Sequence, residues 1–319
     1  MARYGISLSS FDQPLLELRS SIEALPDLGY GDLWAGENYT LDAFTPLIAA
    51  SIWAPTARLG LGIVQAYTRG AAILAMSIAG LCQAAPGRVV VGIGGSTKVI
   101  VEDWNGVPYV KPYARVRDTI RFLRAALAGE KVDEEYESFR VKGFRLRARV
   151  EQPPPIIIGA IRPRMLSLSG ELGDGAMFAN VSAEEVKELI PHVKAKNPNA
   201  EILCSVYVAA NRDTEKVRER ARWVQNEYMN SPVYAAAQEK RGHADELRET
   251  WKRWKAGDRK GAAAAIPDPL IDSLVVHGSA EECREKLQRY IDNGVDTVVL
   301  EMMHGLADPM QAARELAPR

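Results

Sequence analysis

The sequence is poor in the residues on which metal sites and hydrolytic sites depend. Its 319 residues include only four histidines, at positions 192, 243, 277 and 304. Neither the H-E-x-x-H nor the C-x-x-C spacing of metal sites occurs, and the G-x-S-x-G context of a serine nucleophile is absent as well. These absences disfavour hydrolysis by a bound metal or by a nucleophile–base–orienter triad, and we predict no metal site.

Cysteine and long apolar runs are also scarce. Cys82, Cys204 and Cys283 are odd in number, lie far apart and fall in apolar or helical segments, so we interpret them as buried core thiols of a reducing compartment. The first residues lack the charged and apolar regions of a secretory leader, and no run approaches about 18 apolar residues. We therefore expect a cytoplasmic protein with no membrane partner.

The chain has almost no net charge. Forty basic and 41 acidic residues give a formal charge of −1, so no overall attraction toward nucleic acid or an anionic membrane is expected. Anion binding must come from the local placement of arginine and lysine. The expected partner is a small molecule.

What the chain does have is a regular alternation of strand-like and helix-like segments. Each unit takes roughly thirty residues, as a βα repeat does, and this alternation predicts a parallel sheet wrapped by helices. Eight strands favour a closed (β/α)₈ TIM barrel over an open sheet, and its length fits one domain over 1–319. The predicted strands are 4–9, 32–37, 59–64, 88–93, 156–158, 176–181, 201–209 and 295–302.

Two segments do not fit the repeat. Residues 130–152 show a polar alternation that predicts a small hairpin before the fifth strand. Residues 214–269 are helical and too long for one crossover, so we predict a helical insertion after strand seven that covers the C-terminal mouth of the barrel. Between the first two strands, 13–28 is predicted as one helix.

Chemistry in such barrels lies at the C-terminal ends of the strands. After the fifth strand, Arg162 and Arg164 flank Pro163, which is preset for a first helical turn, so a phosphate cradle is predicted there. The alternative, an ordinary turn with solvated arginines, stays open. The glycine-rich turn 92–96 allows close approach of a planar ring or a phosphate, but it lacks the third glycine of the dinucleotide fingerprint, and a plain tight turn is an equal alternative.

The predicted mouth is rich in Gly, Ser, Thr, Asn and Tyr, with scattered arginines and the carboxylate of Glu37 after strand two. Such a composition favours a large anionic cofactor that performs the difficult chemistry itself.

Four stretches of the sequence resemble the luciferase-like superfamily of flavin and deazaflavin oxidoreductases. They are LGYGDLWAGENYTLDAFTPLIAAS, RLGLGIVQAYTRGAAILAMSIAGLCQAAPGRVVVGIG, WNGVPYVKPYARVRDTIRFLRAALAGEKV and PPPIIIGAIRPRMLSLSGELGDGAMFANV. Within the superfamily the chain is more similar to the coenzyme F420-dependent branch, typified by methylenetetrahydromethanopterin reductase, than to bacterial luciferase.

The resemblance implies a barrel that binds the deazaflavin at its C-terminal mouth and transfers a hydride between it and an organic substrate. It also implies a homodimer formed through barrel helices. Two alternatives stay open: an FMN-dependent monooxygenase on the same fold, and a barrel that has lost its chemistry and carries or senses the cofactor.

The resemblance assigns site residues position by position. It implies a non-prolyl cis peptide at Gly62-Ile63, behind the cofactor ring. The residues that it places at the cofactor are Glu37, Gly62, Ile63, Val64, Gly94, Gly95, Ser96, Gly159, Ala160, Ile161, Arg162 and Met165.

Proton transfer is the part of the site on which this chain departs from its relatives. Most relatives have a histidine directly after the strand-two acid, where this chain has Asn38. The general acid or base is therefore expected elsewhere or absent. The predicted catalytic residues are Glu37, Asn38, Tyr67, Glu301 and His304, with Tyr39 as a further candidate for proton delivery.

Overall fold

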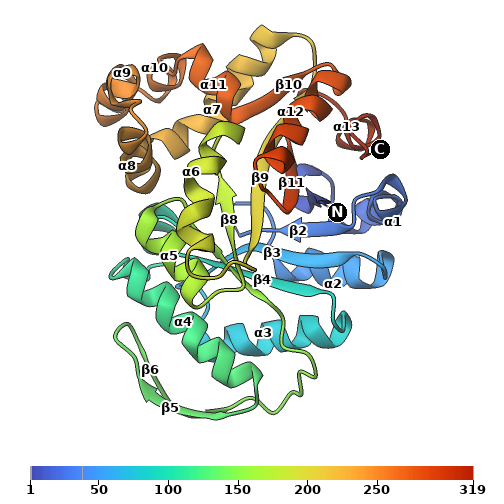
Figure 1. Cartoon of the computed structure of the whole chain (residues 1–319), viewed down its shortest axis with the longest axis vertical. Helices are drawn as coiled ribbons and strands as arrows, with labels where there is room; N and C mark the ends of the chain where they lie inside the picture. The colour runs from blue at the N-terminus through green and yellow to red at the C-terminus, as the bar shows by residue number, and fades with distance from the viewer. Residues whose placement is uncertain (1, 38, 319) are drawn as a thin grey trace.

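The structure, a computed structural model, describes residues 2–37 and 39–318. Eight parallel strands close into a barrel, in the order β11-β1-β2-β3-β4-β7-β8-β9, and β9 pairs with β11 to complete the ring (Figure 1). The predicted (β/α)₈ barrel is thus confirmed. Its strands are β1 (Arg3–Ser7), β2 (Asp32–Ala35), β3 (Arg58–Gln65), β4 (Val89–Gly94), β7 (Ile156–Gly159), β8 (Gly175–Ala179), β9 (Glu201–Ala210) and β11 (Thr297–Met302).

Helices surround the barrel and bury their apolar faces against the outer faces of the strands. Several begin with capping residues that supply acceptors to the free N–H groups of the first turn, such as Ser182 and Ser279, which form capping boxes. The surrounding helices are α1 (Arg19–Ala24), α2 (Phe44–Trp53), α3 (Ala71–Ala84), α4 (Pro112–Leu127), α5 (Pro163–Glu171), α6 (Ala183–Lys194), α12 (Ala280–Asp292) and α13 (Pro309–Glu315).

One prediction about elements was wrong, and one strand was missed. The single helix expected over 13–28 is three short pieces, 3₁₀ turns at Leu15–Leu18 and Pro26–Leu28 around α1, because prolines 14 and 26 lack the N–H that a continuous helix needs. The sequence also hid a ninth strand, β10 (Val275–Gly278), which pairs with the last residues of β9 beyond the closed ring.

The barrel interior is filled at its lower level by one large side chain. Trp34 on β2 is almost fully buried among inward-facing residues of five other strands, including Val90, Leu203 and Val299. Its ring fits because Gly60 stands opposite: a Cβ added there would lie 2.2 Å from the indole. This apolar layer forms the floor on which the upper, open part of the barrel rests.

A charged network closes the opposite, N-terminal end of the barrel. Arg58 bonds Asp32 at 2.5 Å and Glu201 at 2.6 Å, and Arg3 also pairs with Asp32. Asp32 is fully buried, so its charge depends on these partners.

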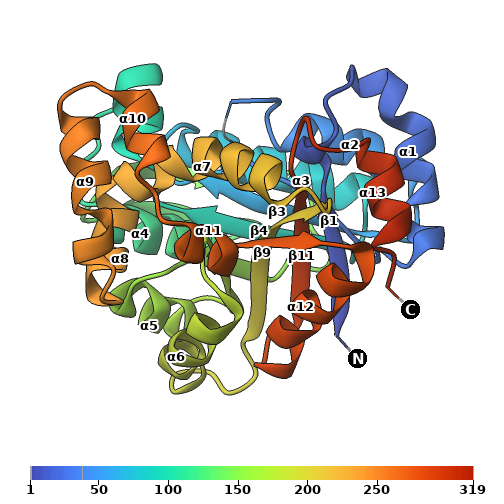
Figure 2. The same ribbon diagram turned by 90° about the horizontal axis from the view of Figure 1, so that it is seen from above.

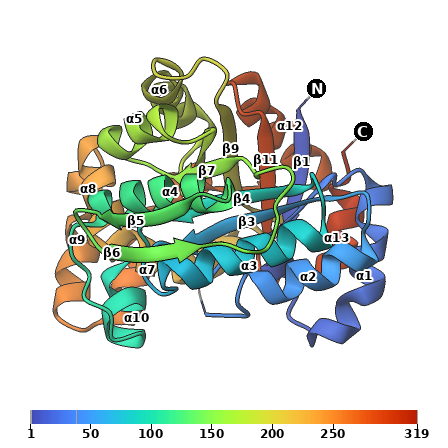
Figure 3. The same cartoon turned by 90° about the horizontal axis from the view of Figure 1, so that it is seen from below.

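The two predicted insertions are confirmed. The hairpin consists of β5 (Lys131–Glu135) and β6 (Arg140–Arg145), and Phe139 and Phe144 pack on Phe122 of α4, outside the barrel (Figure 3). The second insertion, which we call the lid, comprises α7 (Thr214–Asn230), α8 (Pro232–Lys240), α9 (Ala244–Lys255), α10 (Arg259–Ala264) and α11 (Asp268–Leu274). In Figure 2, α8, α9 and α10 stack at one end of the molecule, while both termini lie at the other end.

The three cysteines are free and buried, as predicted. Among the described residues, no helix is both long and apolar enough to cross a membrane.

Candidate functional site

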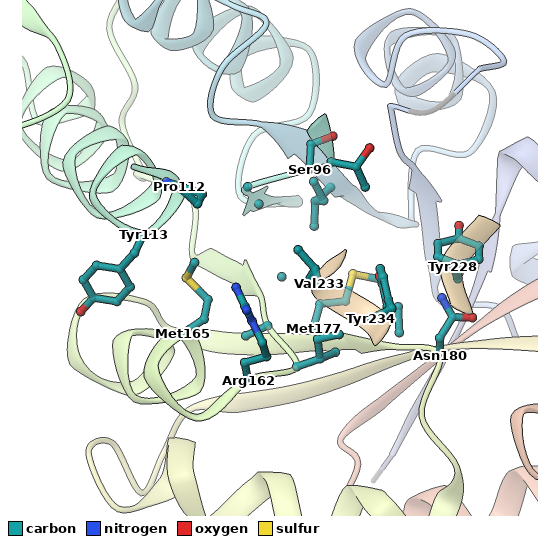
Figure 4. A pocket seen from close by; sticks show the side chains of 18 of the residues that line it. Ser96, Pro112, Tyr113, Arg162, Met165, Met177, Asn180, Tyr228, Val233 and Tyr234 are labelled. Atoms are coloured by element: carbon teal, nitrogen blue, oxygen red, sulfur yellow. The ribbon is translucent and has the colours of Figure 1, made fainter. Parts of the chain in front are cut away.

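A cavity of about 870 Å³ opens at the C-terminal ends of the barrel strands, between the barrel and the lid. This volume lies in the range of about 300–1,000 Å³ found for ligand pockets. Figure 4 shows side chains from the barrel and the lid converging on it. Most predicted site residues line it, namely Glu37, Gly62, Ile63, Gly94, Gly95, Ser96, Gly159, Ala160, Ile161, Arg162, Met165 and Glu301.

One wall of the cavity is a bulge in β3. The register between β3 and β4 shifts between Leu61 and Val64, and the Gly62-Ile63 peptide bond is cis, as the resemblance implied. The neighbouring strand accommodates the bulge only because it carries glycine: a Cβ at Gly92 would lie 2.2 Å from the Leu61 carbonyl oxygen. The glycines of the 92–96 turn thus bring β3 and β4 close together below the cavity.

The loop between β7 and α5 supplies positive charge at one end of the cavity. The Arg162 side chain points into the cavity (Figure 4), and no carboxylate in the described part of the chain lies within ion-pair distance of it. Arg164 instead stacks on Tyr113, with its guanidinium carbon 3.8 Å from the ring centroid. The two arginines are therefore not equivalent, because Arg164 packs on a tyrosine ring whereas Arg162 extends into the cavity without a ring or carboxylate partner in the described chain.

Glu37 faces the cavity but is already paired. Its carboxylate accepts hydrogen bonds from Arg69 at 2.9 and 3.0 Å, and its side chain is 12% exposed. Gln65 donates to its carbonyl oxygen at 3.1 Å. This pairing fixes the carboxylate in place, which suits a positioning role.

Glu301 has a different environment at the end of β11. Ser9 Oγ donates to it at 3.5 Å and Ser205 Oγ donates at 3.3 Å, whereas no lysine or arginine among the residues described lies within 4 Å. Burial raises the pKa of this carboxyl to about 7, against the opposing hydrogen bonds from Ser7, Ser205 and Ser9. A carboxyl with such a pKa can both give and take a proton at neutral pH.

The lid adds tyrosines beside Glu301. The hydroxyls of Tyr207 and Tyr228 lie 3.2 Å apart, and the Tyr228 ring meets the Tyr234 ring edge to face at 5.2 Å. Burial raises the pKa of all three phenols, so they are neutral at physiological pH. Nearby, the buried Asn180 Oδ1 has no hydrogen-bond partner within the described ranges.

Three predicted residues do not line the cavity. Val64 is buried in the core outside the barrel, and the Tyr67 hydroxyl donates to the Val110 carbonyl at 2.6 Å. His304 lies beyond β11, where its carbonyl oxygen accepts a hydrogen bond from Arg220. None of the three is placed for direct contact with a ligand in the cavity. Asn38 lies outside the described residues.

Sequence reasoning missed several lining residues. Tyr109 and Tyr113 reach the cavity from the start of α4, and Tyr228, Val233 and Tyr234 reach it from the lid. These contacts join segments that are distant in sequence. Among the lining residues that were missed, only Ser205 could have been found from the sequence. It lies two residues from both Leu203 and Tyr207, so it shares their inward face of β9. Over 2–37 and 39–318, no group of three or more His, Cys, Asp or Glu side chains could hold a metal ion.

The comparisons with known proteins agree with this geometry. The family model for luciferase-like monooxygenases matches residues 3–297. The chain is 27% identical to the 5,10-methylenetetrahydromethanopterin reductase of Archaeoglobus fulgidus, covering 93% of this chain and 92% of that protein. It is 26% identical to the F420-dependent glucose-6-phosphate dehydrogenase of Mycolicibacterium gilvum, over 74% of this chain and 77% of the relative.

Solved structures show the same fold. The F420-dependent tetrahydromethanopterin reductase of Methanopyrus kandleri superimposes with a TM-score of 0.83 at 22% identity, over 99% of this chain and 97% of the other. An F420-dependent secondary alcohol dehydrogenase, solved with an F420-acetone adduct, gives a TM-score of 0.78 at 16% identity, over 99% and 98% of the two chains.

Proposed function

The chain belongs to the family of luciferase-like monooxygenases, and from that membership we propose that it is a coenzyme F420-dependent oxidoreductase. The observation that carries the proposal is the cavity at the barrel mouth, with the free charge of Arg162 at one end and the glycine-backed bulge of β3 along one wall. The names of similar proteins, a reductase and a dehydrogenase that depend on F420, support this cofactor over FMN.

The residues present fit such a cofactor. A flat ring needs an open wall without side chains, and Gly94, Gly95 and Gly159 line the cavity beside the bulge. An anionic tail needs a cation, which Arg162 provides at the cavity.

When bound, the cofactor supplies a hydride acceptor or donor. The protein's own contribution is to hold it: Ile63 backs the ring, the β7–α5 loop binds the anionic part, and Tyr109 and Tyr113 of the α4 end close the side. Glu37, held in place by Arg69, lines the cavity at the end of β2 and would position the cofactor there. The tyrosines of the lid exclude water from the other end.

A cofactor titration tests the proposal. Purified protein should quench F420 fluorescence with a dissociation constant in the micromolar range or below, and FMN should fail to displace F420 at equal concentration. A protein that binds FMN and not F420 would instead be an FMN-dependent monooxygenase. Absence of binding to either would contradict the proposal.

Variants of the two arginines test which of them binds the anionic part of the cofactor. Arg162→Ala should raise the dissociation constant of F420 about tenfold or more, because one charge-assisted hydrogen bond is worth about 1.5–3 kcal/mol. Arg164→Ala should have a smaller effect, since its guanidinium already stacks on Tyr113. Arg140→Ala, an exposed change on the hairpin, serves as the control. Equal losses in the first two variants would show that both arginines bind the anion.

Two further parts of the proposal rest on the sequence and the family resemblance. We propose a cytoplasmic homodimer, with the exposed apolar side chains Ile48, Ile52, Ile73 and Met76 of α2 and α3 available for the contact between copies. Light scattering of the purified protein would test the dimer.

A further inference from the structure

The cavity has two chemically different ends, and this inference about the second end rests on the proposed function. Lys111, Arg162 and Arg164 come from the start of α4 and the β7–α5 loop. The other end is lined by Ser205, Tyr207 and Glu301 from the strands, with lid tyrosines above them. Figure 4 shows Arg162 and Tyr113 toward one side, and Tyr228 with Asn180 toward the other. With the anionic cofactor at the cationic end, the tyrosine end is left for the substrate.

Glu301 is the group at this end that is built to exchange a proton. It sits where the inward-facing alternation of β11 passes from the apolar Val299 to a polar position. The hydroxyls of Ser9 and Ser205 donate hydrogen bonds to its two oxygens, and these bonds favour the ionised carboxylate. The burial of the side chain favours the protonated carboxylic acid, as does the absence of a lysine or arginine within 4 Å among the described residues. No cation among the described residues pairs with Glu301, whereas Arg69 pairs with Glu37.

The titratable groups that reach Glu301 from β9 and α7 are phenols. The cations at the end of α8 are Lys240, at the cavity, and Arg241, which pairs with Glu185; neither forms an ion pair with Glu301. Tyr207 lies beside it on the neighbouring strand, since the two residues are register partners, and Tyr228 bonds Tyr207. Tyr39 lies near both of these phenols. The raised pKa of Tyr207 and of Tyr228 keeps both protonated, so they can donate a hydrogen bond to a substrate but cannot act as a base at neutral pH.

We propose that Glu301 is the catalytic acid and base, and that the substrate is an uncharged carbonyl compound or the corresponding alcohol whose apolar body packs against Tyr228 and Tyr234. In the reducing direction, the Glu301 carboxylic acid gives its proton to the carbonyl oxygen, while the reduced cofactor, held at the cationic end, would supply the hydride for the new C–H bond. The C=O π bond breaks, the substrate gains two electrons from the cofactor, and the Glu301 carboxylate regains a proton from solvent. Alcohol oxidation is the reverse.

Charge argues for an uncharged substrate. Lys240 of α8 lines the cavity and Arg241 lies beside Asn180, but no lysine or arginine among the described residues lies within 4 Å of Glu301. An anion bound directly against the Glu301 carboxylate would therefore lack a cation at ion-pair distance, and removing an ionised group from water without a partner is costly. A ring or alkyl group, by contrast, gains contact area on the tyrosine rings. A cationic substrate would find a carboxylate but would not need the proton that Glu301 can supply.

The kinetic test uses F420-loaded protein and a panel of uncharged ketones and secondary alcohols, from acetone and cyclohexanone to 1-phenylethanol. The wild type should reduce at least one ketone with reduced F420. In alcohol oxidation, kcat/KM should rise with pH through an apparent pKa near 7. Glu301→Gln should lower kcat at least 100-fold, abolish this pH dependence and leave the F420 dissociation constant within twofold. Glu301→Asp should recover part of kcat.

A second measurement needs neither cofactor nor turnover. The infrared spectrum of the cofactor-free protein should show the C=O stretching band of a protonated carboxylic acid that disappears as pH rises through about 7. Glu301→Gln should remove this band, whereas Glu135→Gln, an exposed change on β5, should leave it.

The outcomes separate the two proposals. Failure of the wild type to bind F420 would overturn the proposed function. F420 binding with an unchanged rate and pH profile in Glu301→Gln, or an infrared band that persists in that variant, would overturn the role of Glu301. Turnover of no ketone or alcohol in the panel, or cyclohexanecarboxylate binding as tightly as cyclohexanone at pH 8, would overturn the substrate class.

Discussion

Two carboxylates face the same cavity, and their neighbours give them opposite properties. Glu37 has a bidentate cation partner in Arg69, which itself lies over the Phe44 ring at 4.7 Å. Glu301 has only serine hydroxyls. Burial therefore disfavours ionisation of Glu301, whereas Glu37 is held by an ion pair. The residue type is the same, and only the partner decides which one is available to carry a proton.

This contrast predicts opposite effects on stability. The folded state raises the pKa of Glu301 from 4.5 to about 7, so it binds more protons than the unfolded state between these values, and stability falls as pH rises through this window. Glu301→Gln should thus raise the free energy of unfolding at pH 8, by about 1–2 kcal/mol after allowance for screening through the open cavity, and change little at pH 4.

Glu37→Gln is the matched comparison. It leaves Arg69 without its closest partner, so it should lower the free energy of unfolding at pH 8 by about 1–2 kcal/mol. Urea unfolding of the cofactor-free variants at both pH values measures these differences. Destabilisation of Glu301→Gln at pH 8 would show that the Glu301 carboxylate is better stabilised than its surroundings indicate.

At the scale of elements, the β3 bulge depends on glycine in the next strand. A Cβ at Gly92 would meet the backbone oxygen of Leu61, which cannot move aside as a flexible side chain can. Gly92→Ala should therefore destabilise the protein by about 2–3 kcal/mol and weaken F420 binding, because Ile63 moves with the bulge. Thermal unfolding and cofactor titration measure the two effects.

Gly80 provides the control for that change. It lies exposed in α3, where an added Cβ meets nothing within 4 Å, so Gly80→Ala should leave F420 binding unchanged and increase stability by up to about 1 kcal/mol. Equal behaviour of the two variants would contradict the packing argument.

The residues around the bulge show which parts of the site could be predicted from the sequence. Strand ends are readable because the βα repeat is regular, so Gly94, Gly95, Gly159 and Arg162 could be placed at the mouth. Whether an arginine at the mouth is free could not be predicted, since the stacking of Arg164 on Tyr113 brings together helices from separate repeats. The resemblance, not the periodicity, gave the cis bond at Gly62-Ile63.

The sequence was least informative for segments whose structure depends on packing against distant parts of the chain. The run 275–278 is only four residues long, and its apolar valines fit a buried helix end as well as a strand. It forms a strand because β9 is ten residues long and extends past the closed ring, which leaves an edge for β10 to pair with. The placement of Tyr228 and Tyr234 likewise depends on how the lid packs, which no periodicity in the sequence specifies.

At the scale of the whole molecule, stability and function occupy opposite ends of the barrel. The Arg58 network with Asp32 and Glu201 closes the N-terminal end, where it satisfies a fully buried carboxylate. The cavity at the C-terminal end has incompletely satisfied groups instead, namely Arg162, Asn180 and Glu301. Such groups are costly in the empty protein and become favourable when a ligand completes them.

The lid has a core of its own, which separates its stability from that of the barrel. Leu247 of α9, Ile271 of α11 and Val217 of α7 belong to a cluster distinct from the main core. Helix α8 has two features that favour local opening. Both polar atoms of the buried Gln238 side chain lack a partner in the described structure, and Gly242, with a φ of 91°, follows the helix. Buried groups left unpaired lower the free energy needed to open such a segment.

Helix α8 also carries Val233 and Tyr234 into the cavity, whereas α9 and α10 contribute no lining residue among those described. F420 should therefore slow amide hydrogen exchange in α8 and in the β7–α5 loop at least tenfold, because a ligand that needs the closed form suppresses opening by mass action. Exchange in α9, α10 and the β5–β6 hairpin should change less than twofold. Mass spectrometry with and without saturating F420 measures this. Uniform protection across the lid would mean that α7 to α11 open as one unit, and unchanged exchange in α8 would show that F420 binding does not require the closed form of this helix.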